Sequence, residues 1–325
     1  MTVYLSELNQ VQIGKEVTYG TAVTTTAKVM GIKTFDITPI TDATIQHDLR
    51  GSLATGYNVN LLRQGATAAF TQDLSYDELY FIESLLGYAS PVGAGPYTRA
   101  YAAPLTSTIS ALRQSTIQYG QSGMVYQLTS AFVDKLSLSG TDSDPLQCSG
   151  SLFAQKAATG TLAALTDRTV TMCMGSQASI YVDTWAGTMG TTVLPTTSWA
   201  WKLDLDSKRQ VRRYVGNLAP QDWNEGGDWT GKLTLSAEVN ATSTAWITTL
   251  LGMTGPLQLQ VQIKYTSDTN HILTIGFAGS AIAAPKLFNN RQGIAAFDLV
   301  LEQTYNSTFA NWLKVNSTNQ VSTLP

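Results

Sequence analysis

Residues Lys232-Leu-Thr-Leu-Ser-Ala-Glu-Val239 alternate polar and apolar side chains without a break. A period of two places every second side chain on the same face, so this stretch predicts a β-strand with one buried and one polar face. Apolar residues then recur at helical spacing from Trp246 to Leu251, and Gly252 follows them. This spacing predicts a short amphipathic helix that ends at the glycine, because glycine readily adopts the left-handed conformation found after helices.

The same succession of strand, polar segment, strand and helix occurs once before in the chain. Upstream, the stretch Phe35-Asp-Ile-Thr-Pro39 corresponds to Trp201-Lys-Leu-Asp-Leu205. Three pairs of glycines mark the correspondence, each separated by 165 or 166 positions: Gly51 and Gly216, Gly65 and Gly231, Gly87 and Gly252. A repeat of this kind predicts two copies of one β-rich module.

Further alternating stretches follow each predicted helix and predict more strands in each half. They are residues 107–118, 125–138 and 146–155 in the first half, and residues 258–265, 271–277 and 294–303 in the second. We therefore expect a mainly β protein of two tandem modules, each a β-sandwich or partial barrel with one short α-helix. The first module, with an N-terminal arm, would span residues 1–160, a linker region 161–194, and the second module 195–325.

Local signals predict where ordered structure and the helices begin. Residues 1–28 lack clear periodicity and predict an irregular lead-in, with order from about Val29 onward. Ser75 and Glu78 match the capping box, in which each side chain accepts a hydrogen bond from the other residue's backbone. This pattern predicts a helix over residues 76–86. The cap of the second helix is expected at Thr242 or Ser243.

The composition limits the classes of function that the chain can serve. Charged residues make up 13% of its 325 residues, about half the usual share. A surface poor in charge suits a protein that packs against copies of itself, although a threonine-rich all-β protein without such contacts fits equally well. The net charge of −3 and the pI of about 5.4 argue against a nucleic-acid interface built from basic patches.

Targeting signals and cysteine pairs are sparse. The N-terminus lacks a basic segment followed by an apolar one, and no apolar stretch is long enough to cross a bilayer. We therefore expect a protein that is made in a cytoplasm and has no membrane anchor. Cys148 and Cys173 lie in no C-x-x-C pattern, which predicts buried free thiols rather than a disulfide or a metal site.

Motifs for phosphate binding and nucleophilic catalysis are incomplete. Residues 226–232 match the first seven positions of a P-loop, but Leu233 stands where a Ser or Thr should hold magnesium, and a strand follows instead of a helix. His47 and His271 are the only histidines, so few residues could act as the general base of a Ser-His-Asp triad. We expect no catalytic residue, no cofactor and no metal site.

Paired carboxylates leave one enzymatic alternative open. Asp142 with Asp144, or Asp204 with Asp206, could in principle serve glycoside hydrolysis. The first pair fits a turn better, and the second, two apart on a strand, fits one solvated face better. An enzyme that acts through such a pair is therefore one alternative function, and the residue patterns favour it least.

The order and spacing of several stretches resemble the major tail proteins, or tail tube proteins, of long-tailed bacteriophages. Residues 13–22, Ile13-Gly-Lys-Glu-Val-Thr-Tyr-Gly-Thr-Ala22, are similar to the N-terminal stretch of that family, and the block from Leu49-Arg-Gly51 to Leu86 is similar to its central part. Further similar stretches are Phe132–Ser139, Pro145–Leu152, Ile180–Asp183, Arg291–Ile294 and Val315-Asn316. The resemblance covers most of the chain, and the second copy of the module distinguishes it from single-module relatives.

The resemblance implies a structural role in the virion. In the family each module contributes an inner sheet of about four strands to a β-barrel that closes on oligomerisation, and stacked rings form a tube for viral DNA. It also implies assembly in the host cytoplasm and contacts with the tape-measure, tail terminator and distal tail proteins, with DNA only in transit. The alternative is a β-sandwich carbohydrate-binding or capsid-decorating virion module, for which seven Trp and fourteen Tyr offer stacking surfaces.

Two modules in one chain also predict the composition of a ring. Strand number fixes the diameter of a barrel, so six two-module chains would widen the lumen roughly twofold. We therefore expect three copies with pseudo-sixfold symmetry. If the second module were an appendage outside the tube, the ring would keep six copies.

Two long polar segments, residues 41–64 and 209–230, are the candidates for contacts between subunits or between rings. They are longer than local connections inside a compact domain, and long segments of this kind are usually functional. They also concentrate charged and aromatic residues in a chain otherwise poor in charge. The residues that we expect at these contacts are Arg50, Tyr57, Arg63, Arg213, Tyr214, Trp223 and Trp229.

Overall fold

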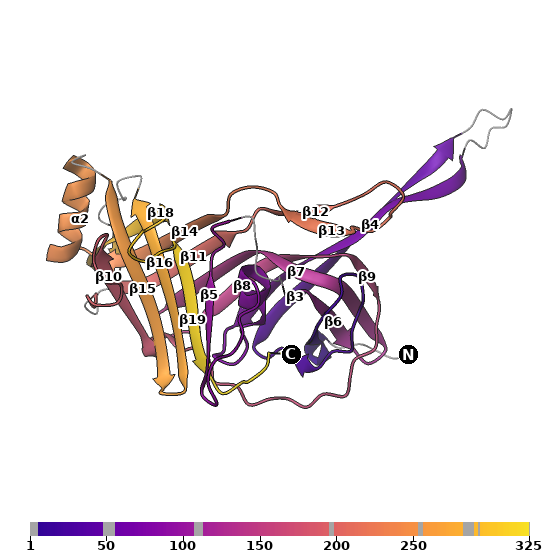
Figure 1. Ribbon diagram of the computed structural model, residues 1–325, viewed down its shortest axis with the longest axis horizontal. Helices are drawn as coiled ribbons and strands as arrows, with labels where there is room; N and C mark the ends of the chain where they lie inside the picture. Colours follow the sequence, from indigo (N-terminus) through magenta and orange to yellow (C-terminus); the bar gives the residue numbers. More distant parts are fainter. Residues whose placement is uncertain are drawn as a thin grey trace.

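The computed structural model describes residues 6–47, 56–106, 113–194, 198–252, 256–281, 289–291 and 293–324. Within these ranges the protein is mainly β, with two short α-helices (Figure 1). The first half contains η1 (Ser6–Leu8), β1 (Gln10–Lys15), β2 (Ala27–Lys28), β3 (Ile32–His47), β4 (Gly56–Asp73), α1 (Tyr80–Leu86), β5 (Tyr97–Ala102), β6 (Ser115–Gln121), β7 (Met124–Thr141), β8 (Gln147–Ala154) and β9 (Lys156–Thr159).

The second half has the same kinds of element. It contains η2 (Gly175–Gln177), β10 (Ala178–Thr184), β11 (Ser198–Asp206), β12 (Arg209–Arg212), β13 (Asp222–Glu225), β14 (Thr230–Glu238), α2 (Ala241–Gly252), β15 (Leu257–Asp268), β16 (His271–Ala281), β17 (Asn289–Arg291), β18 (Ile294–Gln303) and β19 (Leu313–Asn319). Neither described helix is long and apolar enough to cross a membrane.

A central antiparallel sheet runs through both halves in the order β3-β4-β8-β7-β11-β14-β18. The halves join where residues 135–141 of β7 pair with residues 200–206 of β11. At the far end, β17 and the last part of β16 pair with the two ends of β18. β3 pairs with β4 along one edge, and no strand of the described ranges pairs along its other edge. The central sheet of a single chain is therefore open.

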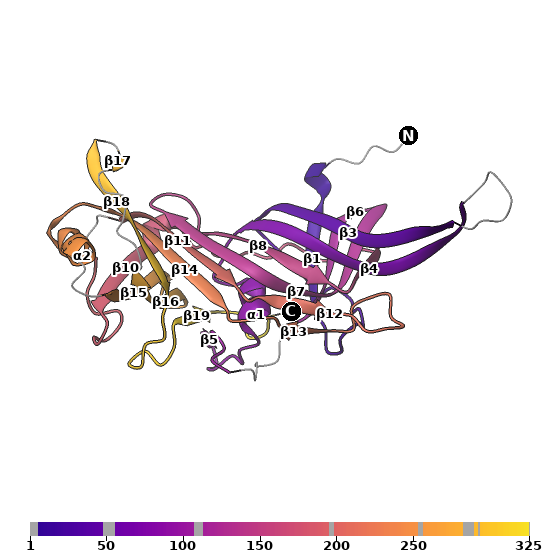
Figure 2. The same cartoon turned by 90° about the horizontal axis from the view of Figure 1, so that it is seen from above.

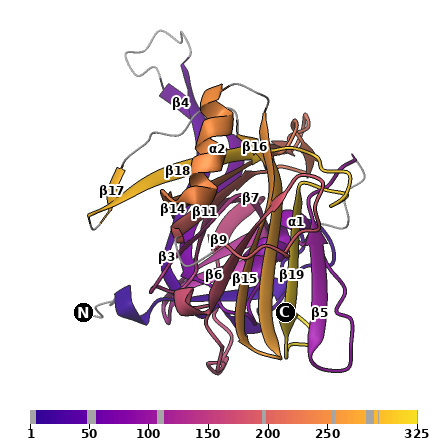
Figure 3. The ribbon, with the colours of Figure 1, turned by 90° about the vertical axis from the view of Figure 1, so that its left-hand side faces the viewer.

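Two smaller layers pack on the apolar face of the central sheet. In the first half the strands β2-β1-β6 pair with the first part of β7, which also pairs with β9. In the second half the layer is β10-β15-β16-β19, and β5 of the first half extends it, as Figure 3 shows from the end of the molecule. The alternation of the strands supplies the core between the layers, with side chains such as Leu136, Leu203, Leu233 and Leu299 buried.

The strand and helix ends predicted from local patterns are largely confirmed. The alternating stretch at residues 232–239 is β14, and the five predicted strands from residue 125 onward correspond to β7, β8, β15, β16 and β18. Both helices stop at the predicted glycines. Gly87 follows α1 with φ of 99°, a conformation that side chains other than glycine rarely adopt.

The expected irregular lead-in is wrong for residues 10–15 and 27–28, which form strands. Residues 10–15 form β1, which pairs along its whole length with β6. The short stretch Gln-Val-Gln-Ile-Gly-Lys has too few residues for a clear period, and its partner lies far away in the sequence. Only the tertiary pairing therefore makes it a strand.

The capping box predicted for the first helix is also wrong. α1 begins at Tyr80, and the buried Ser75 hydroxyl has no hydrogen-bond partner among the described residues. The Glu78 carboxylate instead accepts hydrogen bonds from the Met30 backbone N–H and the Arg168 guanidinium, both at 2.7 Å or less. Burial raises the pKa of Glu78, although these two donors oppose the shift. A buried carboxylate is bound by the strongest donors available, which here are not at the helix N-terminus.

The cap of the second helix lies two residues before the predicted position. The Asn240 side-chain oxygen accepts a hydrogen bond from the Ser243 backbone N–H at 3.0 Å, and the Ser243 hydroxyl accepts one from the Asn240 backbone N–H at 2.7 Å. Asn240 is thus the N-cap of α2 and Ser243 is the reciprocal partner.

Candidate functional site

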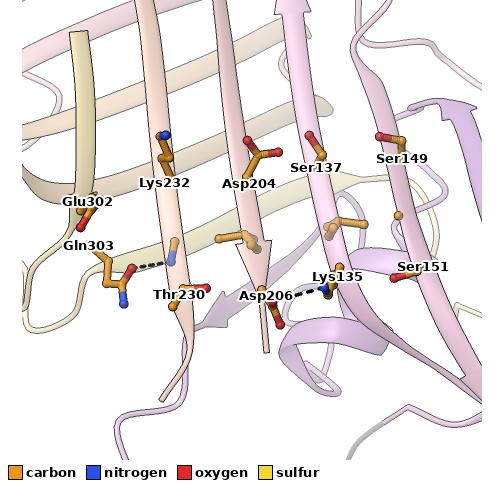
Figure 4. Close-up of a pocket in the computed structure, with 14 residues that line it drawn as sticks. Lys135, Ser137, Ser149, Ser151, Asp204, Asp206, Thr230, Lys232, Glu302 and Gln303 are labelled. Carbon is orange, nitrogen blue, oxygen red and sulfur yellow. Dashed lines mark hydrogen bonds and ion pairs between the residues drawn. The ribbon is translucent and has the colours of Figure 1, made fainter. Parts of the chain in front are cut away.

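Polar and charged side chains gather on one face of the central sheet. Figure 4 shows side chains of five neighbouring strands lining one hollow on this face, from Ser149 and Ser151 on β8 to Glu302 on β18. The registers align one row across six strands: Thr71, Ser149, Ser137, Asp204, Lys232 and Glu302. Because the row crosses the β7–β11 junction, both halves build one continuous polar surface.

This face carries more carboxylates than lysines, and several of the charges are paired. Lys202 lies 2.9 Å from Asp204, and Lys135 lies 3.6 Å from Asp206. Among the described residues the registers bring seven acidic side chains and three lysines to this face: Asp36, Asp73, Asp204, Asp206, Glu238, Asp298, Glu302, Lys135, Lys202 and Lys232. Two further lysines reach it through ion pairs, Lys33 with Asp73 at 2.7 Å and Lys208 with Asp206 at 2.6 Å. The surface is therefore weakly acidic, and mixed signs prevent a strong field of either sign.

Asp206 is a carboxylate in this hollow that two lysines, Lys135 and Lys208, contact. Burial alone would raise its pKa, but hydrogen bonds from the side chain and backbone N–H of Lys208 and the charge of Lys135 outweigh burial. The pKa of Asp206 is consequently below its ordinary value. The Lys208 Nζ–Asp206 Oδ2 distance is 2.6 Å. The carboxylate stays ionised at neutral pH and serves as an anchor for two lysines.

The other sequence patterns for chemistry have structural roles. Thr230 begins strand β14 directly after residues 226–229, so the P-loop-like segment enters a strand as expected. Asp144 lies in a turn with Thr141, and Asp204 and Asp206 share the solvated face of β11. Within the described ranges, no group of three or more His, Cys, Asp or Glu side chains is placed to hold a metal ion.

The first long polar segment is a projecting hairpin rather than an irregular loop. Strands β3 and β4 continue beyond the central sheet, and their pairing extends to His47 and Gly56 (Figure 2). We call residues 42–47 with 56–63 the first arm. Its apolar side chains are largely exposed, with Ile45 at 53% and Val59 at 71% of their full accessible surface. The segment is regular because the two strands satisfy each other's backbone groups.

The second long segment, which we call the second arm, contains the hairpin β12–β13 and lies against the first half of its own chain. The Pro220 carbonyl accepts hydrogen bonds from Gln155 Nε2 at 3.0 Å and from the Tyr19 hydroxyl at 3.4 Å. The Leu218 carbonyl accepts one from the Gln64 backbone N–H at 2.9 Å. Residues 207–229 therefore bridge the two halves within one molecule.

The seven residues expected at contacts between molecules have different surroundings. Arg50 and the side chain of Tyr57 lie outside the described residues. Arg63 pairs with Asp42 within the first arm. Arg213 donates to the Gln64 and Leu218 carbonyls at 2.9 and 3.2 Å and so joins the tip of the second arm to the base of the first. Tyr214 is 51% exposed near the tip of the second arm.

The remaining two residues, Trp223 and Trp229, both lie beside Arg209, which the sequence patterns did not indicate as a contact residue. The Arg209 guanidinium lies 5.5 Å from the Trp223 ring centre and 5.0 Å from that of Trp229. It also donates to the Val133 carbonyl at 3.2 Å and the Ser84 carbonyl at 3.4 Å. The sequence signal for a cation–π contact here is a segment that holds three arginines and two tryptophans. Such a segment is too common to indicate which arginine makes the contact.

Comparison with known proteins adds no assignment. No protein-family model matches the chain, and a search of curated proteins finds no significant match.

Proposed function

We propose that this chain is the structural subunit of a bacteriophage tail tube, in which copies join edge to edge into rings that stack around a lumen for viral DNA. The observation that carries the proposal is the central sheet. It continues across two halves through the β7–β11 pairing and ends at one side in β3, whose second edge has no strand partner in the described ranges. An edge strand of sixteen residues recruits further strands unless it is covered, and ring closure covers it.

The repeated pattern of strand pairing supports a tandem duplication of one module. In the first half β3–β4, β4–β8, β7–β8, β6–β7, β1–β6 and β7–β9 pair. In the second half the corresponding pairs are β11–β14, β14–β18, β16–β18, β15–β16, β10–β15 and β16–β19. A helix follows β4 and β14 alike. Unrelated halves would have no reason to share both the order and the direction of these pairings.

The β7–β11 junction supports a model for the contact between subunits. It joins the last strand of one module's inner sheet to the first strand of the next by seven register pairs. If the same junction forms between molecules, β3 of one copy adds to the far end of the sheet of another. Each chain then supplies two modules, so three copies with pseudo-sixfold symmetry close the ring.

The polar face of the sheet suits the wall of a DNA conduit. Its carboxylates outnumber its lysines, and each of Lys135 and Lys202 lies beside a carboxylate. Such a wall has a small net negative charge and therefore does not bind the phosphate backbone, so a duplex passes without being held. The alternative of a carbohydrate-binding module has less support, because none of the tryptophans is exposed and the exposed tyrosines lie on separate elements rather than on one platform. Among the described residues these tyrosines are Tyr88, Tyr126, Tyr214 and Tyr305.

Negative-stain electron microscopy of the purified protein tests the proposal. Hollow tubes or rings are the expected result, and native mass spectrometry of an isolated ring should give three chains. Six chains would mean that only one half lines the lumen. Discrete monomers at all concentrations, together with binding to glycans, would favour the carbohydrate-binding alternative and refute the tube.

A further inference from the structure

The second arm closes over the helix of the first half. Arg209 at the base of this arm donates to the Ser84 carbonyl on α1 and the Val133 carbonyl on β7. Trp223 on β13 lies 6.0 Å from the Phe132 ring. All residues of α1 are buried. The contact between the halves therefore includes an arm from one half that covers the helix side of the other.

The first arm has the same construction as the second. The cross-strand pair Ile45–Val59 in the first arm corresponds to Val211–Trp223 in the second. Ile45 follows Phe35, and Val211 follows the matching Trp201, by the same ten positions. In the second arm both residues of this pair are partly buried, and Trp223 lies against Phe132 of the first half. In the first arm both side chains are more than half exposed.

α2 is the counterpart of α1, but its surface is open. Leu251 is 59% exposed, Trp246 and Leu250 are partly exposed, and the helix holds no charged residue. Counted back from the matched glycines Gly87 and Gly252, Thr249 takes the place of Ser84. The exposed surface of α2 is thus uncharged and accessible, and Leu251 is its exposed large apolar side chain.

The first arm and α2 of one molecule cannot meet. They lie at opposite ends of the chain, the arm projecting at the right and α2 at the left of Figures 1 and 2. The exposed pair Ile45–Val59 and the exposed side of α2 can therefore meet only between copies, in a head-to-tail contact. Such a contact closes into a ring when the rotation between neighbouring copies divides a full turn. The second copy is therefore the occupant that this geometry requires.

We propose that the first arm of one copy docks over α2 of its neighbour, in the way that the second arm covers α1 within the chain. The inference rests on the ring proposed above and adds a specific surface to it. Ile45 and Val59 supply the apolar contact from the arm, and Leu251 supplies it from α2. The two kinds of junction in the ring are then built alike, one within the chain and one between chains.

Charge insertion on either surface tests the docking. Val59→Asp and Leu251→Asp should each raise the protein concentration needed for ring assembly roughly tenfold or more, because an unpaired carboxylate would be buried in an apolar contact. Both positions are exposed in the monomer, so circular dichroism and thermal unfolding of the monomer should not change. The matched control is Val17→Asp, at a position 95% exposed outside both surfaces.

Cross-linking between two variants identifies the contact directly. Ala43 takes the place of Arg209, so a mixture of Ala43→Cys and Thr249→Cys chains should give a dimer on a denaturing gel after treatment with a short bis-maleimide. Cys148 and Cys173 are buried and should not compete. A mixture of Val17→Cys and Thr249→Cys chains should give none. Rings that form normally from Val59→Asp chains, or rings without the cross-link, would overturn the docking and leave the tube proposal intact. If the unaltered protein forms no ring under any condition, both proposals fail.

Discussion

The ion pair between Arg113 and Glu83 should be a main determinant of stability in the first half. Arg113 Nη1 lies 2.8 Å from Glu83 Oε1, and both side chains are fully buried. The Tyr101 hydroxyl donates to the other carboxylate oxygen at 3.1 Å. Arg113 also donates to the Leu324 carbonyl at 3.3 Å, so the pair connects α1 to the end of the second half.

The burial of both groups sets the magnitude of the effect. Arg113→Met removes the positive charge and leaves the Glu83 carboxylate in an apolar interior with only the tyrosine as donor. Breaking a buried ion pair from one side costs about 3–5 kcal/mol, because the remaining charge loses its compensation. Replacement of both partners by apolar residues of similar volume leaves no such charge and is often close to neutral. The double variant Arg113→Met with Glu83→Leu should therefore be more stable than Arg113→Met alone.

Urea unfolding monitored by circular dichroism measures these free energies. Asp167→Asn serves as the control, because its ion pair with Lys28 is largely exposed and such pairs contribute about 0–1 kcal/mol. The reasoning would be refuted if Arg113→Met cost no more than the control, or if the double variant lost as much stability as the two single variants together.

Three further predictions concern other sites. Asp183 is buried and accepts hydrogen bonds from the backbone N–H groups of Gly190 and Thr192 and from the Thr191 hydroxyl. These bonds outweigh the effect of burial and lower the pKa of Asp183. The substitution Asp183→Asn should therefore cost about 1–3 kcal/mol of stability at pH 7. Because the folded-state pKa is depressed, this stabilisation is complete above the ordinary carboxyl pKa of about 3.9 and is lost as pH falls through the folded value, so unfolding at pH 7 and pH 3 should show a shrinking difference from the unaltered chain. A methyl group at Gly140 would collide with Tyr265 and Trp201, whose side chains share a hydrogen bond of 3.1 Å, so Gly140→Ala should cost about 1–3 kcal/mol in thermal unfolding. Gly227→Ala, where the nearest atom is 3.9 Å away, should change stability by less than about 0.5 kcal/mol, and an equal loss at both positions would contradict this account. The substitutions His47→Gln and His271→Gln, or Cys148→Ser with Cys173→Ser, should leave ring assembly intact and cost about 0.5–3 kcal/mol of folding stability. A stoichiometric metal in the purified protein would contradict this prediction.

The sequence by itself determined the strands that alternate strongly and the C-terminal ends of both helices. The period of two in Lys232–Val239 and the positive φ of Gly87 are local properties, because side-chain direction and backbone conformation depend here on neighbouring atoms. The polar face of β11 followed for the same reason, since Asp204 and Asp206 lie two apart. Such signals need no knowledge of the partner strand.

Only the tertiary structure decided which strands pair and where the arms lie. β1 is a strand because β6 satisfies its backbone, and Glu78 is not a helix cap because Met30 and Arg168 offer better donors in the interior. The junction of β7 with β11 and the docking of Arg209 on α1 join residues far apart in the chain. These contacts depend on the free energy of burying particular pairs of surfaces, which no local pattern of side chains encodes.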